Sequence, residues 1–231
     1  MRKEAGFTVA EILVVMGLLG VLLVGLIRVE AAFISSSTTI VAESSTIQEL
    51  TDAISYLGDT ARRAAWVQTT GTVAGNTCSI TATAPCFFMV APDPVDPTAS
   101  LVDRYTYFVF RVERRTTQAV RTANAWADEN TWAVNQYTAT ACSNAVPGTP
   151  GIPLCEGTPP VTSTIASTSE ANLVVDGLVL SGPSGAVPLF AYDAAQRRLT
   201  MRLQAAYRDG GRARFVPATT PLSTSVIIRN L

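Results

Sequence analysis

Histidine is absent from this chain of 231 residues, and lysine occurs once, at position 3. Beyond Lys3 the chain therefore has no histidine base, no phosphate-loop lysine and no Schiff-base lysine. The side chains left as usual metal ligands are cysteines and carboxylates. The GxSxG, GxGxxG and CxxC patterns are also missing. From these absences we predict that the protein is not an enzyme and binds no cofactor or metal ion.

Charge is scarce and nearly balanced. The chain has 17 basic and 18 acidic residues, for a net charge of −1. This near-neutrality argues against bulk electrostatic binding of nucleic acid. Hydrophobic residues make up 48% of the chain, which is enough for one core in addition to an apolar N-terminal run. We expect one folded domain outside that run.

The apolar run extends from Ile12 to Ile27 and follows a single carboxylate, Glu11. As a helix, Ile12 to Ile27 spans about 24 Å, and including Phe7 to Glu11 brings it close to the roughly 30 Å of a hydrocarbon core. A charge at the centre of a membrane helix costs about 2.5–3.5 kcal/mol, and less near its end. A simple anchor has no reason to carry that charge, so we predict a helix with a role beyond anchoring.

The residues around Glu11 resemble the cleavage motif of type IV prepilins and type II secretion pseudopilins. A short basic leader precedes Gly6, and Phe7 follows it, with Glu11 and the apolar tail after them. The resemblance implies that prepilin peptidase cuts between Gly6 and Phe7 on the cytoplasmic side, and that Phe7 becomes N-methylated. The apolar helix then stays on the mature chain, unlike a secretory signal, whose cleavage site follows its apolar core.

The resemblance also implies a role for Glu11. In that family the acid pairs with the N-terminal amine of an adjacent subunit and helps to recruit it. Residues 7 and 11 lie one turn apart on one helical face, and an unpaired carboxylate is costly in apolar surroundings. The implied partners are prepilin peptidase, other pilins or pseudopilins, the inner-membrane assembly platform and membrane lipid. A plain single-pass anchor with Arg2 and Lys3 inside is the alternative, but it explains neither Glu11 nor the position of Gly6.

We divide the chain into four segments: a leader at 1–6, a hydrophobic transmembrane and assembly helix at 7–29, the soluble half of that helix at 30–66, and a β-rich head with long loops at 67–231. Apolar residues in the third segment repeat at helical intervals: Ile47, Leu50, Ile54, Leu57, Ala61 and Ala64. We expect this stripe to pack on the head, and Ser35 to Thr39 to loosen the helix locally. An independent amphipathic surface helix is the alternative.

Strand patterns follow Trp66. Arg104 to Glu113 alternates as expected of a strand with one buried face. Further strands are expected at Leu173–Leu180, Val187–Tyr192, Leu199–Tyr207, Arg212–Val216 and Ser225–Arg229, with a turn at residues 209–211. The fold class is therefore α+β: a long N-terminal helix packed on an antiparallel β-sheet, as in pilins.

Four cysteines flank regions that we expect to be loops. Cys78 and Cys86 bracket one loop, and Cys142 and Cys155 lie within the Pro-, Gly-, Ser- and Thr-rich stretch from Ala141 to Ser169. Pro92 to Pro97 is a further expected loop. Of the three possible connectivities, we favour the two local disulfides, which suit an exported protein. A four-cysteine zinc site is the alternative, although the usual short C-x₂₋₄-C pairs are missing.

Six arginines occur close together in the C-terminal part: Arg197, Arg198, Arg202, Arg208, Arg212 and Arg214. If they converged on one face, they could hold DNA phosphates. Arginines that alternate with apolar residues on strands more often form a solvated face. DNA is therefore a possible partner only if the strands bring these side chains together.

Two further segments resemble minor pilins and pseudopilins of the PilW and GspJ type: Leu57 to Trp66 and Ser223 to Asn230. The chain also lacks the proline that major pilins often have midway along the first helix. We therefore predict a minor pilin or pseudopilin that is processed by prepilin peptidase and incorporated into a fibre, or primes its assembly. Type IV pili, type II secretion and competence pseudopili share this N-terminal signal.

The predicted location is a single pass through the inner membrane before assembly, with the N-terminus cytoplasmic and the head extracytoplasmic, and then a pilus or pseudopilus at the cell surface. The alternative function is a pilus-associated adhesin or DNA-binding subunit that acts through its disulfide-closed loops.

Overall fold

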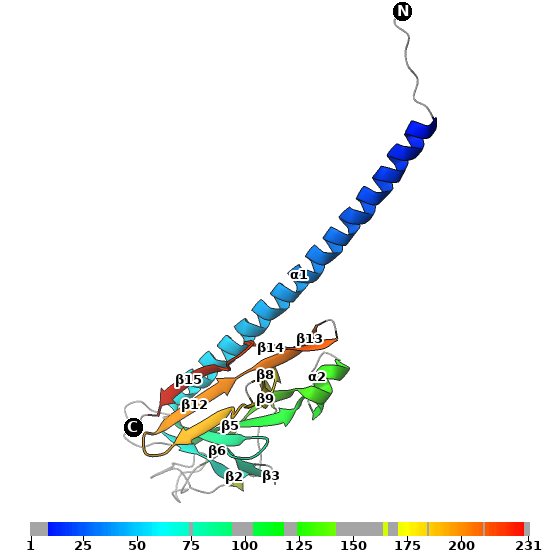
Figure 1. Cartoon of the computed structure of the whole chain (residues 1–231). Helices are drawn as coiled ribbons and strands as arrows, with labels where there is room; N and C mark the ends of the chain where they lie inside the picture. Colours follow the sequence, from blue (N-terminus) through cyan, green and yellow to red (C-terminus); the bar gives the residue numbers. More distant parts are fainter. Residues whose placement is uncertain are drawn as a thin grey trace, which may run out of the picture. The chain divides into compact units, whose positions relative to one another are not determined.

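The structure is a computed structural model that describes residues 9–73, 76–93, 104–117, 124–141, 164–165, 171–183, 185–209 and 211–228 (Figure 1). The chain divides into two compact units, Met1–Ser45 and Thr46–Leu231. The boundary lies within the first helix, α1 (Val9–Arg63). Each unit is described by itself.

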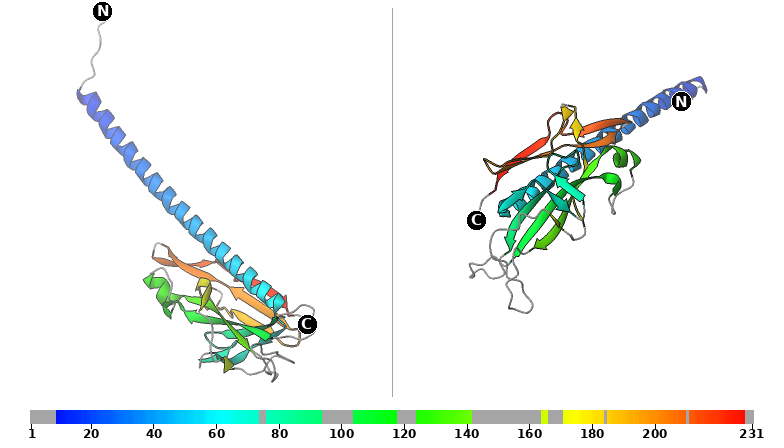
Figure 2. Two further views of the ribbon diagram at one scale, coloured as in Figure 1. Left: turned by 180° about the vertical axis from the view of Figure 1, so that it is seen from behind. Right: turned by 90° about the horizontal axis from the view of Figure 1, so that it is seen from below.

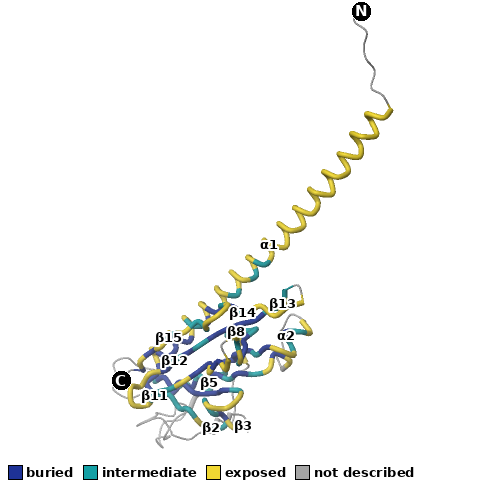
Figure 3. The backbone as a smooth tube through the Cα atoms, viewed as in Figure 1, coloured by how far each residue is buried: buried dark blue, intermediate teal, exposed yellow. Residues whose placement is uncertain are grey.

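In the first unit, α1 is exposed along its whole apolar stretch, and every residue from 9 to 38 is exposed (Figure 3). The expected loosening at Ser35 to Thr39 does not occur, because the helix continues through these residues. The hydroxyls of Thr38 and Thr39 donate to the carbonyl of Ser35, at 2.9 and 3.0 Å. These bonds stay within one helical turn, so polar β-branched residues are accommodated without a break.

In the second unit, the last part of α1 buries one face. Leu50, Ala53, Leu57 and Ala61 are at most 3% exposed, whereas Ile47 remains 41% exposed. The predicted stripe therefore packs on the head, except at its first position. The helix ends at Arg63. The main chain then joins the sheet, where the amide of Ala65 donates to the carbonyl of Val90 in β4 at 2.8 Å.

The main sheet has seven antiparallel strands in the order β1-β4-β5-β6-β8-β13-β14. Its strands are β1 (Trp66–Gln68), β4 (Cys86–Asp93), β5 (Arg104–Arg114), β6 (Trp132–Ala141), β8 (Asn172–Leu178), β13 (Ala205–Asp209) and β14 (Arg212–Val216). A second antiparallel sheet has the order β11-β12-β15, with β11 (Phe190–Asp193), β12 (Arg198–Leu203) and β15 (Leu222–Ile227). The α+β fold class predicted from the sequence is confirmed.

The remaining elements are small. A three-stranded sheet has the order β3-β2-β7, formed by β2 (Thr70–Val73), β3 (Asn76–Ser79) and β7 (Thr164–Ile165), in which β2 and β7 run parallel. Strand β7 interrupts the long loop expected from Ala141 to Ser169. The other elements are the hairpin β9 (Ser181–Gly182) and β10 (Gly185–Ala186), the 3-10 turn η1 (Arg115–Thr117) and the helix α2 (Ala125–Asn130).

The first hydrophobic core joins the seven-stranded sheet, the three-stranded sheet β11-β12-β15 and the last part of α1. In the right-hand view of Figure 2, this part of α1 (cyan) lies between the green strands of the seven-stranded sheet and the red strand β15 of the three-stranded sheet. Phe87 of β4 connects the two sheets, because its ring contacts Phe110 of β5 and Phe190 of β11, with centroids 5.5 and 4.7 Å apart. Large apolar side chains from all three layers therefore share one interior.

A second core lies on the opposite face of the seven-stranded sheet. It comprises Cys78, Cys86, Phe88, Val90, Tyr105, Tyr107 and Val109. The prediction that β5 has one buried face is therefore wrong. Phe110 and Val112 point into the first core, while Tyr105, Tyr107 and Val109 point into the second. Both faces of this central strand are covered, so the alternation of its side chains does not separate buried residues from exposed ones.

The expected strand Leu199–Tyr207 is two strands, because the chain changes sheets at Gln204. This side chain is fully buried, and its Nε2 donates to the carbonyl of Pro217 at 2.7 Å. Strand β12 before it belongs to the three-stranded sheet, and β13 after it belongs to the seven-stranded sheet. Other predicted strands keep their places with shifted ends: β8 ends at Leu178, β11 begins at Phe190 and β15 covers Leu222–Ile227.

A buried ion-pair network lies at one end of the seven-stranded sheet. The Arg115 side chain is 8% exposed and pairs with Asp128 of α2 and with Asp176 of β8, where Nε to Oδ2 is 2.7 Å. The backbone amide of Asp176 in turn donates to Glu49 of α1 at 3.2 Å. Burial lowers the pKa of Arg115, but the hydrogen bonds and charges of Asp176 and Asp128 outweigh that effect, so its pKa is raised. The network thus joins η1, α2, β8 and α1.

Candidate functional site

The N-terminal candidate site has one described member, Glu11, which lies in the first turn of α1. Gly6 and Phe7 are outside the described residues. The apolar side chains that follow Glu11 are largely exposed: Leu13, Met16, Val21 and Leu22 each leave at least two thirds of their surface accessible. Within the first unit, the structure therefore presents one carboxylate at the start of an uncovered apolar helix.

Among the described residues, α1 is the one helix long and apolar enough to cross a membrane. Its most apolar window of 18 residues has a mean hydropathy of 2.7, and none of that window is buried. A signal sequence near an N-terminus would satisfy the same criterion. Exposure on this scale in water is unfavourable, at about 25 cal/mol per Å² of apolar surface. Lipid or other apolar helices are the environments that this surface suits.

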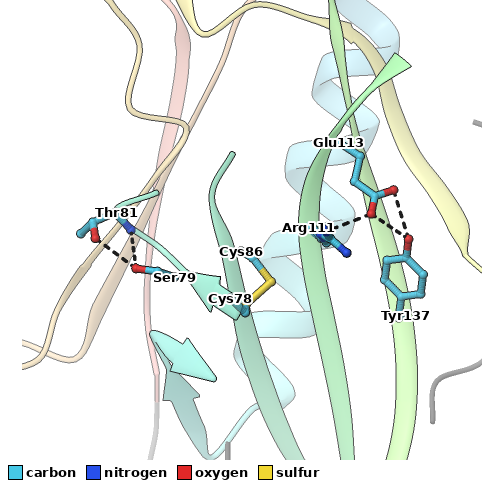
Figure 4. Close-up of a disulfide and its surroundings, with 7 residues drawn as sticks. All are labelled: Cys78, Ser79, Thr81, Cys86, Arg111, Glu113 and Tyr137. Carbon is cyan, nitrogen blue, oxygen red and sulfur yellow. Dashed lines mark hydrogen bonds and ion pairs between the residues drawn. A yellow bond between two sulfur atoms is a disulfide. The ribbon is translucent and has the colours of Figure 1, made fainter. Parts of the chain in front are cut away.

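The second candidate site is the loop closed by a disulfide between Cys78 at the end of β3 and Cys86 at the start of β4 (Figure 4). Both cysteines are 2% exposed and belong to the second core. The loop between them exposes Thr81, Ala82 and Thr83. Cys142 and Cys155 lie outside the described residues. Because Cys78 and Cys86 are joined to each other, they are not thiolate ligands for the zinc site considered as the alternative.

Removing the Cys78–Cys86 disulfide should destabilise the head. The two cysteines are eight residues apart in sequence, and loop-closure entropy gives about 2.5 kcal/mol for so short a loop. We expect a Cys78→Ala/Cys86→Ala variant to lose roughly that much free energy of unfolding, measured by urea titration. An equal urea midpoint for the variant and the parent protein would contradict the role assigned to the disulfide.

A polar cluster lies beside the disulfide on the same face of the sheet. Glu113 accepts a hydrogen bond from Asn135 Nδ2 at 2.6 Å. It also accepts one from the hydroxyl of Tyr137 at 3.0 Å, and the Nε of Arg111 lies 3.3 Å from its Oε1 (Figure 4). Burial raises the pKa of Tyr137, and the Glu113 carboxylate raises it further. Asn135 is 2% exposed, and among the described residues its Oδ1 finds no hydrogen-bond partner. Both carboxylate oxygens of Glu113 accept hydrogen bonds from side chains of β6, so the cluster holds β5 and β6 together.

Two tyrosines in the second core make the head sensitive to alkali. Burial raises the pKa of Tyr107 to about 12, with the nearby Tyr105 adding to the effect. Such a tyrosine stabilises the fold below its unfolded pKa of about 10, and that contribution is lost as the pH rises toward 12. We expect the free energy of unfolding to fall by roughly 1–2 kcal/mol between pH 10 and pH 12. Urea titrations of the parent protein and of Tyr107→Phe across this range measure it, and equal slopes would contradict the assignment.

The C-terminal arginines do not converge on one face. Arg198 and Arg202 lie on the outward face of β12, where exposed and buried residues alternate. On the β13–β14 hairpin, Arg212 and Arg214 stand opposite Asp209 and Tyr207 in the strand register. Arg208 stands opposite Ala213, and its side chain points to the other face of the hairpin. Arg214 also lies 3.4 Å from Asp209. This arrangement does not form the single phosphate-binding surface that the DNA hypothesis requires.

Sequence reasoning missed the Arg115 network and the Glu113 cluster. Arg111 and Glu113 alternate along one face of β5, and Arg115 follows the end of that strand, a pattern that resembles a solvated strand. The available signal was their alternating charge: opposite charges two residues apart on one strand face are neighbours. Among the residues that the structure describes, no group of three or more histidine, cysteine or acidic side chains is arranged to hold a metal ion.

Comparison with known proteins identifies one motif. Residues 1–27 match the family model of the prokaryotic N-terminal methylation motif. No curated protein and no solved structure matches the chain. The matched residues contain Gly6, Phe7, Glu11 and the apolar run. The match supports a type IV prepilin-like protein, and a structural subunit rather than an enzyme. It is also consistent with membrane anchoring through α1.

Proposed function

We propose that the protein is a minor type IV pilin or pseudopilin, a structural subunit that is cleaved by prepilin peptidase and enters, or primes, a fibre. The observation that carries the proposal is the coincidence of the methylation motif at residues 1–27 with a helix that is exposed over its whole apolar stretch. A helix of this kind requires apolar partners, and a fibre core of packed helices supplies them.

The mechanism begins with cleavage between Gly6 and Phe7, which leaves a methylated amine at residue 7. Glu11 lies one helical turn from that amine. The chain from Phe7 onward has no lysine or histidine, so this amine is its only cation other than arginine. In a lipid or fibre interior, the carboxylate of Glu11 pairs with the amine of a neighbouring subunit, because leaving either charge unpaired there is costly. The pair sets the axial register in which a subunit is extracted from the membrane.

Fractionation of cells tests this proposal. We expect the native protein in the sheared surface-fibre or pseudopilus fraction when prepilin peptidase is present, and only in the inner membrane when the peptidase is deleted. A Gly6→Leu variant should behave like the peptidase deletion, whereas Ala5→Leu, which leaves the cleaved bond unchanged, is the matched control. Fibre incorporation that is independent of the peptidase would contradict the proposal.

A second candidate function, adhesion through the disulfide-closed loops, is favoured by one observation: the exposure of Thr81 to Thr83 in a loop fixed at both ends by Cys78 and Cys86. Replacing residues 80–84 with a glycine–serine linker of equal length separates the two candidates. Loss of adhesion with normal fibres supports the second function, and unchanged adhesion leaves assembly as the function of the chain.

A further inference from the structure

Strand β15 has one unpaired edge. In the sheet order β11-β12-β15, it pairs with β12, and none of the strands that the structure describes lies on its other side. The pairing with β12 is regular, from Arg198 opposite Ile227 to Leu203 opposite Leu222. An exposed edge of this kind offers backbone donors and acceptors to any extended chain that meets it, and proteins usually cover or shorten such edges.

The register identifies which backbone groups are free. The amide of Ile228 donates to the carbonyl of Arg197 at 2.9 Å, so these two residues form a hydrogen-bonded pair. Hydrogen-bonded pairs alternate along an antiparallel ladder, which directs the backbone groups of Ser223, Ser225 and Ile227 away from β12. Within the described part of the chain, no hydrogen bond satisfies these outward groups. The three side chains are exposed as well, and Ile227 leaves 66% of its surface accessible.

A pocket of about 530 Å³ lies beside this edge, and its described lining residues are Arg62, Ser225, Val226 and Ile227. Its volume is within the range of ligand and peptide sites. Arg62 comes from the last turn of α1 and pairs with Asp59, but the two side chains are 67% and 70% exposed. An ion pair in that setting contributes little, so Arg62 can exchange Asp59 for the carboxylate of a partner.

The arginine side chains near this edge favour a negatively charged peptide. On the outward face of the sheet, Arg198 and Arg202 flank Thr200, which hydrogen-bonds Ser225 of β15 at 2.9 Å. Arg62, in the last turn of the neighbouring helix, lines the pocket beside the edge. An acidic chain therefore complements this edge, and a basic one is repelled.

We propose that the free edge of β15 and the Arg62 pocket form a docking site for an extended acidic peptide segment of a partner protein. The segment adds as a fourth strand to the sheet β11-β12-β15. Its backbone pairs with Ser223, Ser225 and Ile227, and an acidic side chain enters the pocket to meet Arg62. Alternate apolar side chains of the segment cover Ile227. Main-chain bonds thus give affinity, and the pocket gives selectivity.

Binding of two labelled hexapeptides to the full chain in detergent micelles tests this proposal by fluorescence anisotropy. One peptide alternates valine with aspartate, and the other alternates valine with lysine. We expect the aspartate peptide to bind roughly tenfold more tightly or better, a difference of about 1.4 kcal/mol. Its addition should slow hydrogen exchange at the amides of Ser223, Ser225 and Ile227.

Two pairs of variants locate the site. Ser225→Pro removes an outward amide without removing a bond to β12, and should weaken the aspartate peptide roughly tenfold. Ser225→Ala keeps the amide and should leave affinity within about twofold. Arg62→Glu should abolish the preference for the acidic peptide, whereas Arg212→Glu, on the separate β13–β14 hairpin, should not alter it. If Ser225→Pro fails to fold, the proposal is tested by the peptide preferences of Arg62→Glu and Arg212→Glu and by hydrogen exchange of the parent protein.

Three results would overturn the proposal. One is the absence of aspartate-peptide binding up to about 1 mM, the weak end of specific recognition. Another is binding that Arg62→Glu leaves unchanged. The third is protection of the three amides by raising the concentration of the protein alone, because the occupant would then be a second copy of this chain. All three are independent of N-terminal cleavage, so the docking proposal and the proposed function can fail separately.

Discussion

Replacing Glu11 with alanine is expected to block fibre incorporation while leaving cleavage of the leader and folding of the head intact. The variant removes the partner of a neighbouring N-terminal amine in apolar surroundings, and breaking a buried ion pair by removing one member costs about 3–5 kcal/mol. Since each 1.4 kcal/mol or so is tenfold in an equilibrium, we expect a loss of roughly a hundredfold or more in incorporated subunit. Quantitative immunoblots of sheared fibres and membranes provide the measurement.

Two controls separate this effect from a general perturbation of the helix. Glu30→Ala removes an exposed carboxylate from the same helix beyond the apolar run, and incorporation should be normal. Glu11→Asp keeps the charge and should retain part of the incorporation. Normal assembly by Glu11→Ala would show that the carboxylate does not act in recruitment, whereas uncleaved Glu11→Ala would assign it to peptidase recognition.

Arg115→Ala is expected to have the largest effect on the stability of the head. The guanidinium lies between Asp128 and Asp176, and the side chains of all three are at most 23% exposed. Its removal leaves two carboxylates close together with no cation between them, at a cost of about 3–5 kcal/mol. Urea unfolding of the full chain in detergent, followed by tryptophan fluorescence, measures the loss.

Arg62→Ala is the matched control, because its ion pair with Asp59 is two-thirds exposed and should be worth less than about 1 kcal/mol. A triple variant, Arg115→Met/Asp128→Asn/Asp176→Asn, removes the charges together and should recover most of the lost stability. Equal destabilisation by Arg115→Ala and Arg62→Ala would contradict the structural role of the network.

The parts of the fold that the sequence predicted are those governed by local periodicity. The stripe at Leu50, Leu57 and Ala61 packs as expected, because residues three and four apart share a helical face. The strand at residues 104–113 was correctly placed, but its two buried faces were not expected. The second core is formed by strands distant in sequence, and no local pattern in β5 specifies what covers its far side.

The parts that the sequence did not predict depend on tertiary contacts of single polar residues. Gln204 ends β12 because its side chain bonds Pro217 across the chain, a partner that local sequence does not reveal. The partners of Arg115 could not be predicted either, because Asp128 of α2 and Asp176 of β8 lie 13 and 61 residues away in sequence. The motif at Gly6, Phe7 and Glu11, by contrast, is linear, so it could be read directly. The comparison with known proteins matched the same stretch.

The central claim is that the chain is processed as a prepilin, and the mass of the native N-terminal peptide tests it most directly. Protein isolated from its own cells and digested next to arginine should yield an N-terminal peptide that begins at Phe7 and carries one methyl group on its amine. A peptide that runs from Lys3 to Arg28, which this digestion releases from an unprocessed chain, would contradict the account, because Glu11 would then have no amine one turn away. The absence of any peptide that contains Glu11 would contradict it as well, because that residue would then have been removed.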